Sequence, residues 1–281
     1  MPQYSCSECG AAFDTPIGRR SHRGECNSLI QKPASMPLNP PTVAVIVPFR
    51  EQALCDQDRS AQLARFIPHM QQFFEGQRAV LFIARQSQDG RKFNRGQLLN
   101  SGFLAVQQMH PSLTTVVFHD VDLLPATDMV ASYLQPPAEG TALHLASGWR
   151  KYAYPGFIGG VVSFRPADFR RFNGFPNNYW GWGCEDDQLR CRMMHFGMRS
   201  VAHEGGSFTD LDPINMLQRF YSQERKDMQH YNEHLLRPTG HKLDTDWATN
   251  GLDGMAELNM ESTQCSSLDD ISLYDYNFIL T

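Results

Sequence analysis

Residues 114–122 read TTVVFHDVD, a β-branched apolar run that ends directly in two aspartates. Two similar runs precede it, VAVIVPF at 43–49 and AVLFIA at 79–84. Such runs are typical of buried parallel strands. Between them, residues 58–75 and 93–108 carry apolar side chains at helical spacing. This alternation predicts an α/β domain with a parallel sheet, in which ligands bind at the carboxyl ends of the strands.

The downstream sequence predicts the remaining elements of this domain. LHLAS (143–147) reads as a strand, and YPGFIGGVVSF (154–164) contains a Gly-Gly pair that lets backbone approach a ligand closely. Residues 166–173 predict a short helix. AELNM (256–260) and ISLYDYNFIL (271–280) alternate or run apolar, which indicates late edge strands.

Charged and aromatic residues gather at the predicted ends of the first and third strands. Alternation along a strand places Asp120 and Asp122 on the same side, where they can hold a divalent cation bound to a diphosphate. Arg50 and Arg95 are candidates for diphosphate contacts, and Phe49 and Phe93 for packing against a base. Taken singly, each of these four is equally compatible with an ordinary surface arginine or core phenylalanine.

Residues 173–187, NGFPNNYWGWGCEDD, combine two tryptophans, several glycines and three consecutive carboxylates. Glycine-rich backbone beside large aromatics is typical of a loop that covers a ligand. The carboxylates of Glu185, Asp186 and Asp187 open an apolar-periodic stretch, which indicates the N-terminus of a helix. These carboxylates could therefore cap the helix, or they could take part in a reaction; the pattern is compatible with both roles.

Composition limits the class of protein. The 281 residues carry a net charge of −5 and are 41% hydrophobic, so the chain can bury a core and lacks the charge for broad binding to nucleic acid or anionic membrane. There is no signal-peptide pattern and no apolar run long enough to cross a bilayer. Seven cysteines, three of them clustered at metal-ligand spacing, favour a reducing compartment. We therefore expect a cytoplasmic or nuclear protein that does not bind membranes.

The first residues predict a small separate domain. Cys6, Cys9, His22 and Cys26 have the spacing of a ββα zinc finger in which a cysteine replaces the final histidine. We expect this finger at 1–28 with a structural Zn²⁺, a proline-rich linker at 29–42, and the α/β domain at 43–281. A single finger contacts only about three base pairs, so docking of a protein partner or structural capping is favoured over DNA reading.

Five motifs in this order resemble the β-1,4-galactosyltransferases: VPFR (47–50), FNRGQLLNSGF (93–103), FHDVDLLP (118–125), FIGGVVSF (157–164) and the stretch at 173–187. The match covers roughly 43–200, and NGLDGMAELNM (250–260) resembles the closing strands of that family. The resemblance implies a GT-A fold with a mostly parallel sheet, a UDP-sugar donor, Mn²⁺ or Mg²⁺, and transfer with inversion at the anomeric carbon.

The resemblance also implies roles for individual residues. Trp182 matches the tryptophan of a small mobile loop that closes over the donor, Glu185 and Asp186 match the acceptor-binding pair with Asp186 as general base, and Tyr179 joins the acceptor site. Asp122 matches the acidic metal ligand. The positions expected at the donor are Pro48, Phe49, Arg50, Phe93, Asn94, Arg95, Asp120, Val121, Asp122, Phe157, Gly160 and Trp182.

Three departures from the family pattern affect this interpretation. The histidines that complete the metal site are missing, and Asp210 with Asp212 is the favoured replacement, with His203 as the alternative. Phe157 replaces a common tyrosine beside the donor sugar, and its bulk slightly favours galactose over an N-acetylated sugar. Golgi members of that family carry a membrane anchor, whereas this chain has the predicted finger, so the identity of the acceptor is left undecided.

Two further functions stay open on the sequence. A catalytically inactive GT-A domain that binds sugar or protein is favoured by the missing histidines, whereas the intact acidic pairs argue against it. A transferase that acts on a nucleic-acid acceptor brought by the finger is the other alternative.

Overall fold

The computed structural model describes residues 4–5, 12–13, 40–51, 58–152, 154–212, 232–236, 240, 242–255, 260–268 and 271–280. The chain divides into two compact units, Met1–Pro40 and Pro41–Thr281. In the first unit, β1 (Tyr4–Ser5) pairs antiparallel with β2 (Ala12–Phe13). The four predicted zinc ligands lie outside the described residues, so the finger remains a prediction.

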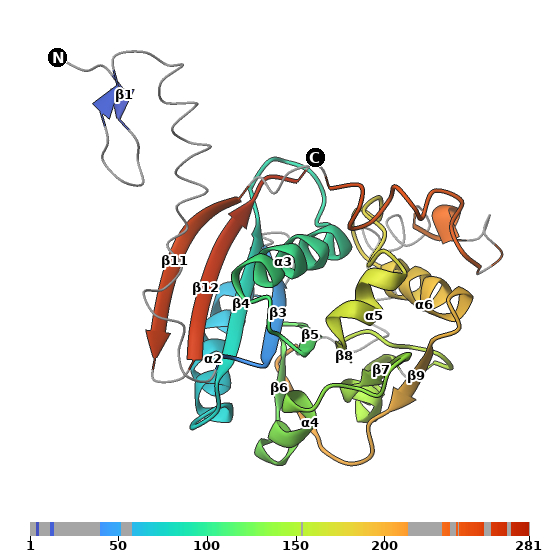
Figure 1. The fold of residues 1–281 in the computed structure, drawn as a ribbon, viewed down its shortest axis with the longest axis horizontal. Coiled ribbons are helices and arrows are strands. Elements are labelled where there is room, and N and C mark those ends of the chain that lie inside the picture. The colour runs from blue at the N-terminus through green and yellow to red at the C-terminus, as the bar shows by residue number, and fades with distance from the viewer. Residues whose placement is uncertain are drawn as a thin grey trace. The chain divides into compact units, whose positions relative to one another are not determined.

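The second unit is built on an eight-stranded sheet with the strand order β11-β12-β4-β3-β5-β8-β7-β9 (Figure 1). Its first half comprises β3 (Val43–Phe49), β4 (Ala79–Gln86), β5 (Thr115–His119) and β12 (Ile271–Phe278), and its second half comprises β7 (Thr141–His144), β8 (Val161–Phe164) and β9 (Arg199–Ala202). The strand β11 (Met260–Leu268) forms the edge. Four of the seven pairings are parallel.

Helices cover both faces of this sheet because the strand residues alternate between two cores. Val43, Val45 and Val47 face the helices α2 (Arg59–Phe73) and α4 (Val130–Leu134), whereas Ala44 and Ile46 face the other side. That other side is covered by α3 (Arg95–Met109), α5 (Pro166–Arg171) and α6 (Glu185–His195). The result is a three-layer α/β/α arrangement (Figure 1).

The chain direction creates a switch point between β3 and β5. From β3 the chain passes through α2 to β4 on one side, and then through α3 to β5 on the other side of β3. Ligands of α/β sheets bind at such points, outside the carboxyl ends of the strands. Arg50 follows β3 and Asp120 follows β5, so both predicted donor motifs lie at this edge.

Most predicted elements form at the expected positions. The strand at 43–49 has the predicted bounds, and the helix starting at Glu185 is present. The predicted strand at 143–147 differs, because β7 ends at His144 and the chain continues as a 3-10 turn over Leu145–Gly148. The late strand at 271–278 is present, but it is not the edge strand that was expected, because it pairs with β11 on one side and with β4 on the other. Residues 256–259 of the other predicted edge strand lie outside the described residues. Within the described residues, no helix is long and apolar enough to cross a membrane; the compartment stays a prediction.

A buried ion pair fixes α6 to the rest of the domain. Arg192 is fully buried, and its Nε and Nη2 donate to the two carboxylate oxygens of Asp244. The same guanidinium donates through Nη1 to the carbonyl oxygen of Gly174 at 3.0 Å. Asn173, with a φ of 62°, donates to Trp247 O at 2.7 Å and accepts from Asp253 N at 2.9 Å. These bonds hold the stretch before α6 against residues 244–253.

We expect Arg192→Met to destabilise the fold by about 3–5 kcal/mol, because it leaves Asp244 buried without its cation. Arg190→Met is the matched control, since Arg190 lies on the same helix but is only half-buried, and its cost should stay below about 1 kcal/mol. Urea unfolding followed by tryptophan fluorescence measures both. Equal losses in the two variants would contradict the assigned role of the ion pair.

Candidate active site

The end of β3 supplies one wall of the site. Phe49 is buried, and the Arg85 guanidinium lies 4.5 Å from the centroid of its ring. Arg50 donates through Nη1 to the carbonyl oxygen of Arg91, while its Nε is buried and has no hydrogen-bond partner among the described residues. A buried donor without a partner costs free energy unless a ligand supplies an acceptor. Arg50 is therefore suited to an anionic ligand, as expected for a donor diphosphate.

Arg95 joins the two halves of the site. Its Nε donates to Asp120 Oδ1 at 2.8 Å, and its Nη1 lies 3.4 Å from Glu185 Oε1. Burial lowers the pKa of Arg95, but the carboxylates of Asp120 and Glu185 outweigh it and raise that pKa above its ordinary value. The side chain thus stays cationic and links the end of β5 to the first turn of α6.

The first turn of α6 carries the three carboxylates predicted from the sequence. Burial raises the pKa of Glu185, although the charge of Arg95 acts against that shift. The pKa of Asp186 is raised well above its ordinary value by burial, and then by the charges of Glu185 and Asp187. A carboxylate with a raised pKa is a stronger base near neutral pH. Burial and the neighbouring charges therefore make Asp186 a stronger proton acceptor than an exposed aspartate, and its role as general base stays a prediction.

The backbone of the Gly-Gly pair approaches Asp186 closely. A β-carbon added at Gly159 would clash with Asp186 Oδ2 and would lie 2.6 Å from the ring of Phe157. At Gly160 the φ is +78°, and an added β-carbon would lie 3.3 Å from the ring of Trp149. Both glycines therefore let the segment before β8 lie against large side chains.

The remaining donor positions lie in the segment before β8, directly after β5 and in β3. Phe157 is half-buried and packs against Tyr154, with 5.2 Å between ring centroids. Val121 is buried, and Asp120 N donates to Gly160 O at 2.9 Å. The Pro48 backbone belongs to β3 and pairs with Ala84. These residues shape the site through packing and backbone contacts.

Asn94 and Tyr179 differ from the expectation that they face a ligand. Asn94 is fully buried, its Oδ1 caps α3 by accepting from Gln97 N, and its Nδ2 donates to Asn177 O at 2.6 Å. Tyr179 is 3% exposed and packs against Cys184. The tertiary packing turns the polar group of each residue inward, and a contact of either with a ligand stays a prediction.

The tryptophan-glycine stretch lies against the loop before α3. Gly181 N donates to Phe93 O at 2.6 Å, and the Arg91 guanidinium lies 4.8 Å from the centroid of the Trp180 ring. Trp182 is half-buried, and Asn232 Nδ2 donates to its carbonyl oxygen at 3.1 Å. The half-buried Phe93 packs against the core below. The role of Trp182 as a lid stays a prediction.

The predicted metal ligands are paired with basic side chains in the structure. Asp122 Oδ2 lies 2.9 Å from Arg59 Nη1, and Lys151 Nζ contacts both Asp210 and Asp212. Among the described residues, no three histidine, cysteine or acidic side chains converge as a metal site. The oxygen donors nevertheless suit Mn²⁺ or Mg²⁺ in chemistry.

His203, the alternative ligand, is engaged elsewhere. Its Nε2 lies 2.6 Å from Ser132 Oγ, and its Nδ1 lies 2.8 Å from the carbonyl oxygen of Gly205. Both ring nitrogens thus have partners, as do the carboxylates of Asp210 and Asp212, so the choice between these ligands stays a prediction.

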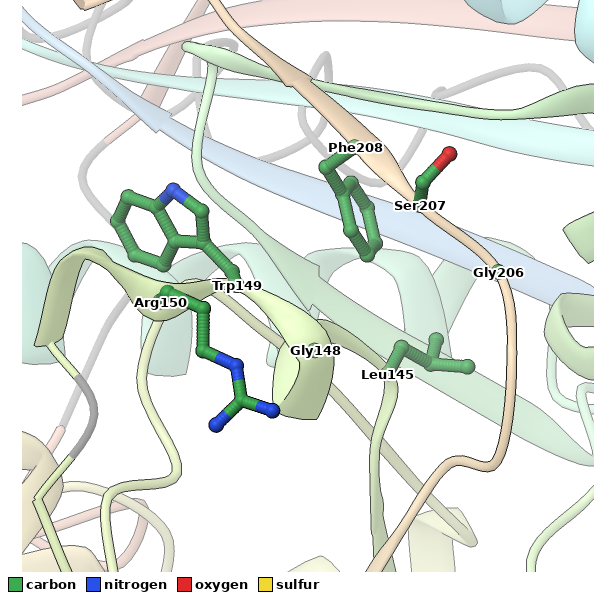
Figure 2. Close-up of a pocket in the computed structure, with 7 residues that line it drawn as sticks. All are labelled: Leu145, Gly148, Trp149, Arg150, Gly206, Ser207 and Phe208. Atoms are coloured by element: carbon green, nitrogen blue, oxygen red, sulfur yellow. The ribbon is translucent and has the colours of Figure 1, made fainter.

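A cavity lies beside these carboxylates. Its volume is about 260 Å³, and Figure 2 shows the rings of Trp149 and Phe208 on one side of it and the Arg150 side chain pointing away from them. Leu145, Gly148, Gly206 and Ser207 complete the lining. None of the donor positions predicted from the sequence lines it. Trp149 connects the cavity to the site, since its Nε1 donates to Asp210 Oδ2 at 3.0 Å.

We expect Arg95→Met to destabilise the protein by about 3 kcal/mol at neutral pH, because Glu185 and Asp120 lose their shared cation. The pKa values of both carboxyls then rise further above those of the unfolded chain, so the folded variant binds more protons. Its stability should therefore fall more steeply than that of the wild type as the pH rises from about 5 to about 8.

Urea unfolding across that pH range tests the role of Arg95, with Arg85→Met as the control because its partner Asp275 lies outside this cluster. A loss that does not depend on pH would contradict the bridging role.

Comparisons with known proteins show which family the chain resembles. A family profile described as the N-terminal region of glycosyl transferase group 7 matches residues 30–134, and one described as the N-terminal domain of galactosyltransferase matches residues 142–225. The Drosophila melanogaster β-1,4-galactosyltransferase 7 is 30% identical over 254 residues, covering 85% of this chain and 75% of the fly protein. The human β-1,4-galactosyltransferase 4 is 34% identical, but the match covers 54% of this chain and 42% of the human protein.

Solved structures show the same relationship. The catalytic domain of the Drosophila enzyme, in complex with xylobiose, matches with a TM-score of 0.61 and 27% identity, over 85% of this chain and 94% of that one. A mutant of that enzyme was solved with manganese, UDP-Gal and xylobiose, and also matches with a TM-score of 0.61. From the agreement in sequence over three quarters of the fly protein and in fold over its catalytic domain, the chain belongs to the β-1,4-galactosyltransferase family.

Proposed function

We propose that this protein is an inverting glycosyltransferase that moves galactose from UDP-galactose to a hydroxyl group of a sugar acceptor with the help of a divalent metal ion. The observation that carries the proposal is the arrangement around Arg95. It joins Asp120, at the predicted donor edge, to Glu185, which is next to Asp186. The relative solved with manganese and UDP-Gal supports the choice of donor and metal.

On the donor side, the cations at the sheet edge bind the diphosphate. The unpartnered Nε of Arg50 provides a donor for a phosphate oxygen, and Phe49 provides an apolar surface nearby. A metal ion would be held by Asp122 together with Asp210 and Asp212, and it would stabilise the charge of the leaving diphosphate. Trp182 closes over the bound sugar as a lid.

On the acceptor side, the two carboxylates divide the work. Glu185 accepts a hydrogen bond from the sugar and thereby orients it. Asp186 takes the proton of the attacking hydroxyl while its oxygen forms a bond to the anomeric carbon and the bond to the diphosphate breaks. Attack from the face opposite to the leaving group inverts the anomeric configuration.

Two relatives support a xyloside as the acceptor class. The Drosophila structures hold xylobiose, and a Caenorhabditis elegans relative that is 33% identical is named a xylosylprotein 4-β-galactosyltransferase. A β-xyloside is therefore the first acceptor to test, beside β-glucosides and β-N-acetylglucosaminides. Zinc binding at 1–28, by Cys6, Cys9, His22 and Cys26, remains a separate proposal from spacing alone.

A second candidate, a sugar-binding domain without catalysis, is favoured by the pairing of Asp122 with Arg59 and of Asp210 and Asp212 with Lys151. Transfer of labelled galactose from UDP-galactose with added Mn²⁺ distinguishes the two. Binding of sugar without any transfer would favour this second function.

We expect Asp186→Asn to lower kcat by about a thousandfold, because the variant lacks the group that accepts the proton. In the wild type, kcat should decline toward acid with a pKa above the ordinary range of an aspartate, since the base must be deprotonated and its pKa is raised. The pH dependence of kcat with a saturating xyloside and UDP-galactose measures both effects.

Asp187→Asn is the control for Asp186→Asn, because Asp187 lies on the same helical turn and contacts Tyr154. Its loss of activity should be much smaller. If both variants retained wild-type kcat, Asp186 would not be the base.

We expect Gly159→Ala to lower kcat/KM by about a hundredfold, because the added methyl group displaces Asp186 or Phe157 from its position. Gly148→Ala is the matched control, since its added β-carbon would meet only Gly206 O at 3.9 Å. Steady-state kinetics, with circular dichroism to confirm folding, measures the difference. Similar kinetics in the two variants would show that the close approach of Gly159 does not position the base.

A further inference from the structure

Lys151 lies between the two aspartates that were expected to hold metal. Its Nζ donates to Asp212 Oδ2 at 2.6 Å, to Asp210 Oδ2 at 3.0 Å and to Asp212 O at 3.1 Å. The side chain of Lys151 is 9% exposed and that of Asp212 only 1%. The ammonium group is therefore held in a largely desolvated site by two carboxylates.

Neighbouring groups hold both aspartates in this arrangement. Trp149 Nε1 donates to Asp210 Oδ2 at 3.0 Å, and Asp212 N donates to Asp210 Oδ1 at 2.8 Å. The Lys151 ammonium also lies 5.9 Å from the centroid of the Trp149 ring. Trp149 and Lys151 therefore both contact Asp210, the last residue of β10 (Phe208–Asp210), one through a hydrogen bond and the other through an ion pair.

Asp122 adjoins the pair of strands that β10 forms. The strand β10 pairs antiparallel with β6 (Leu123–Pro125), and Leu211 N donates to Asp122 O at 2.7 Å. Asp122 itself is paired with Arg59. Arg59 and Lys151 thus pair with the three predicted metal ligands, and Lys151 bridges Asp210 and Asp212.

We propose that Lys151 is an internal cation that occupies Asp210 and Asp212 in the absence of metal and competes with a divalent ion for these carboxylates. This inference rests on the proposed metal dependence of transfer. Two positive groups cannot share the same oxygens at short range, so metal binding requires that the ammonium leave. The free energy of the lysine contacts is then subtracted from that of metal binding, and Lys151 sets how much metal the protein needs.

Removal of Lys151 should therefore tighten metal binding. In Lys151→Met the buried carboxylates lose their cation, and a metal ion restores the balance of charge that the variant lacks. Isothermal titration of the full chain with Mn²⁺ alone should show about tenfold tighter binding than in the wild type. Lys151→Arg keeps the positive charge and should bind Mn²⁺ about as weakly as the wild type. Equal or weaker binding by Lys151→Met would overturn the proposal.

A second measurement uses the wild-type protein, in case Lys151→Met does not fold. Reductive methylation of lysines, followed by mass spectrometry, reports how accessible each amine is. Saturating Mn²⁺ should increase methylation of Lys151, while the exposed Lys92 serves as the internal control. If Mn²⁺ binds and the methylation of Lys151 does not change, the competition does not occur.

These measurements separate this inference from the proposed function. Neither needs a donor, an acceptor or transfer. Active wild-type enzyme with unchanged binding in Lys151→Met would refute the competition alone, whereas tighter binding in Lys151→Met without transfer by the wild type would refute the proposed function alone.

Discussion

The buried pair between Arg192 and Asp244 is the interaction on which the site depends. Arg192 lies on the helix whose first turn carries Glu185 and Asp186, and it also binds the carbonyl oxygen of Gly174. Both side chains of the pair are buried, so the cost of removing their charges from water is offset only when the guanidinium and the carboxylate are hydrogen-bonded to each other. The helix is therefore held in one position against residues 244–253, and its carboxylates point at the sheet edge from a rigid support.

Charge pairing then organises the edge itself. Arg95 stands between Asp120 and Glu185, Arg59 pairs with Asp122, and Lys151 bridges Asp210 and Asp212. This arrangement keeps several buried carboxylates close together without a bound ion. Under the proposed function, metal and donor would bind to a site whose charges are already partly balanced, and affinity for metal would then depend on the release of protein cations.

Particular residues show which parts of the site sequence reasoning reaches. Asp120 and Arg95 were expected at strand and helix ends, and the structure brings them to 2.8 Å of each other. Arg59 and Lys151 were missed because their partners lie 63 and 61 residues away and no local pattern links them. Arg192 carried a weak signal, since it lies at helical spacing beside Leu189 and Met193 on the face that α6 buries. Asn94 and Tyr179 were assigned to ligands because their motif resembles a known one, but packing turns them inward.

The sequence by itself determined the α/β class, the first three strands with the two helices between them, and the carboxylates that open α6. The periodicity of apolar residues and the residues at strand ends can be read from short stretches of sequence, because each depends only on near neighbours in the chain. Only the tertiary structure decided which charge faces which. The pairing of Lys151 with Asp210 and Asp212, and of Arg192 with Asp244, depends on how distant segments pack, because burial makes each unpaired charge too costly to leave alone.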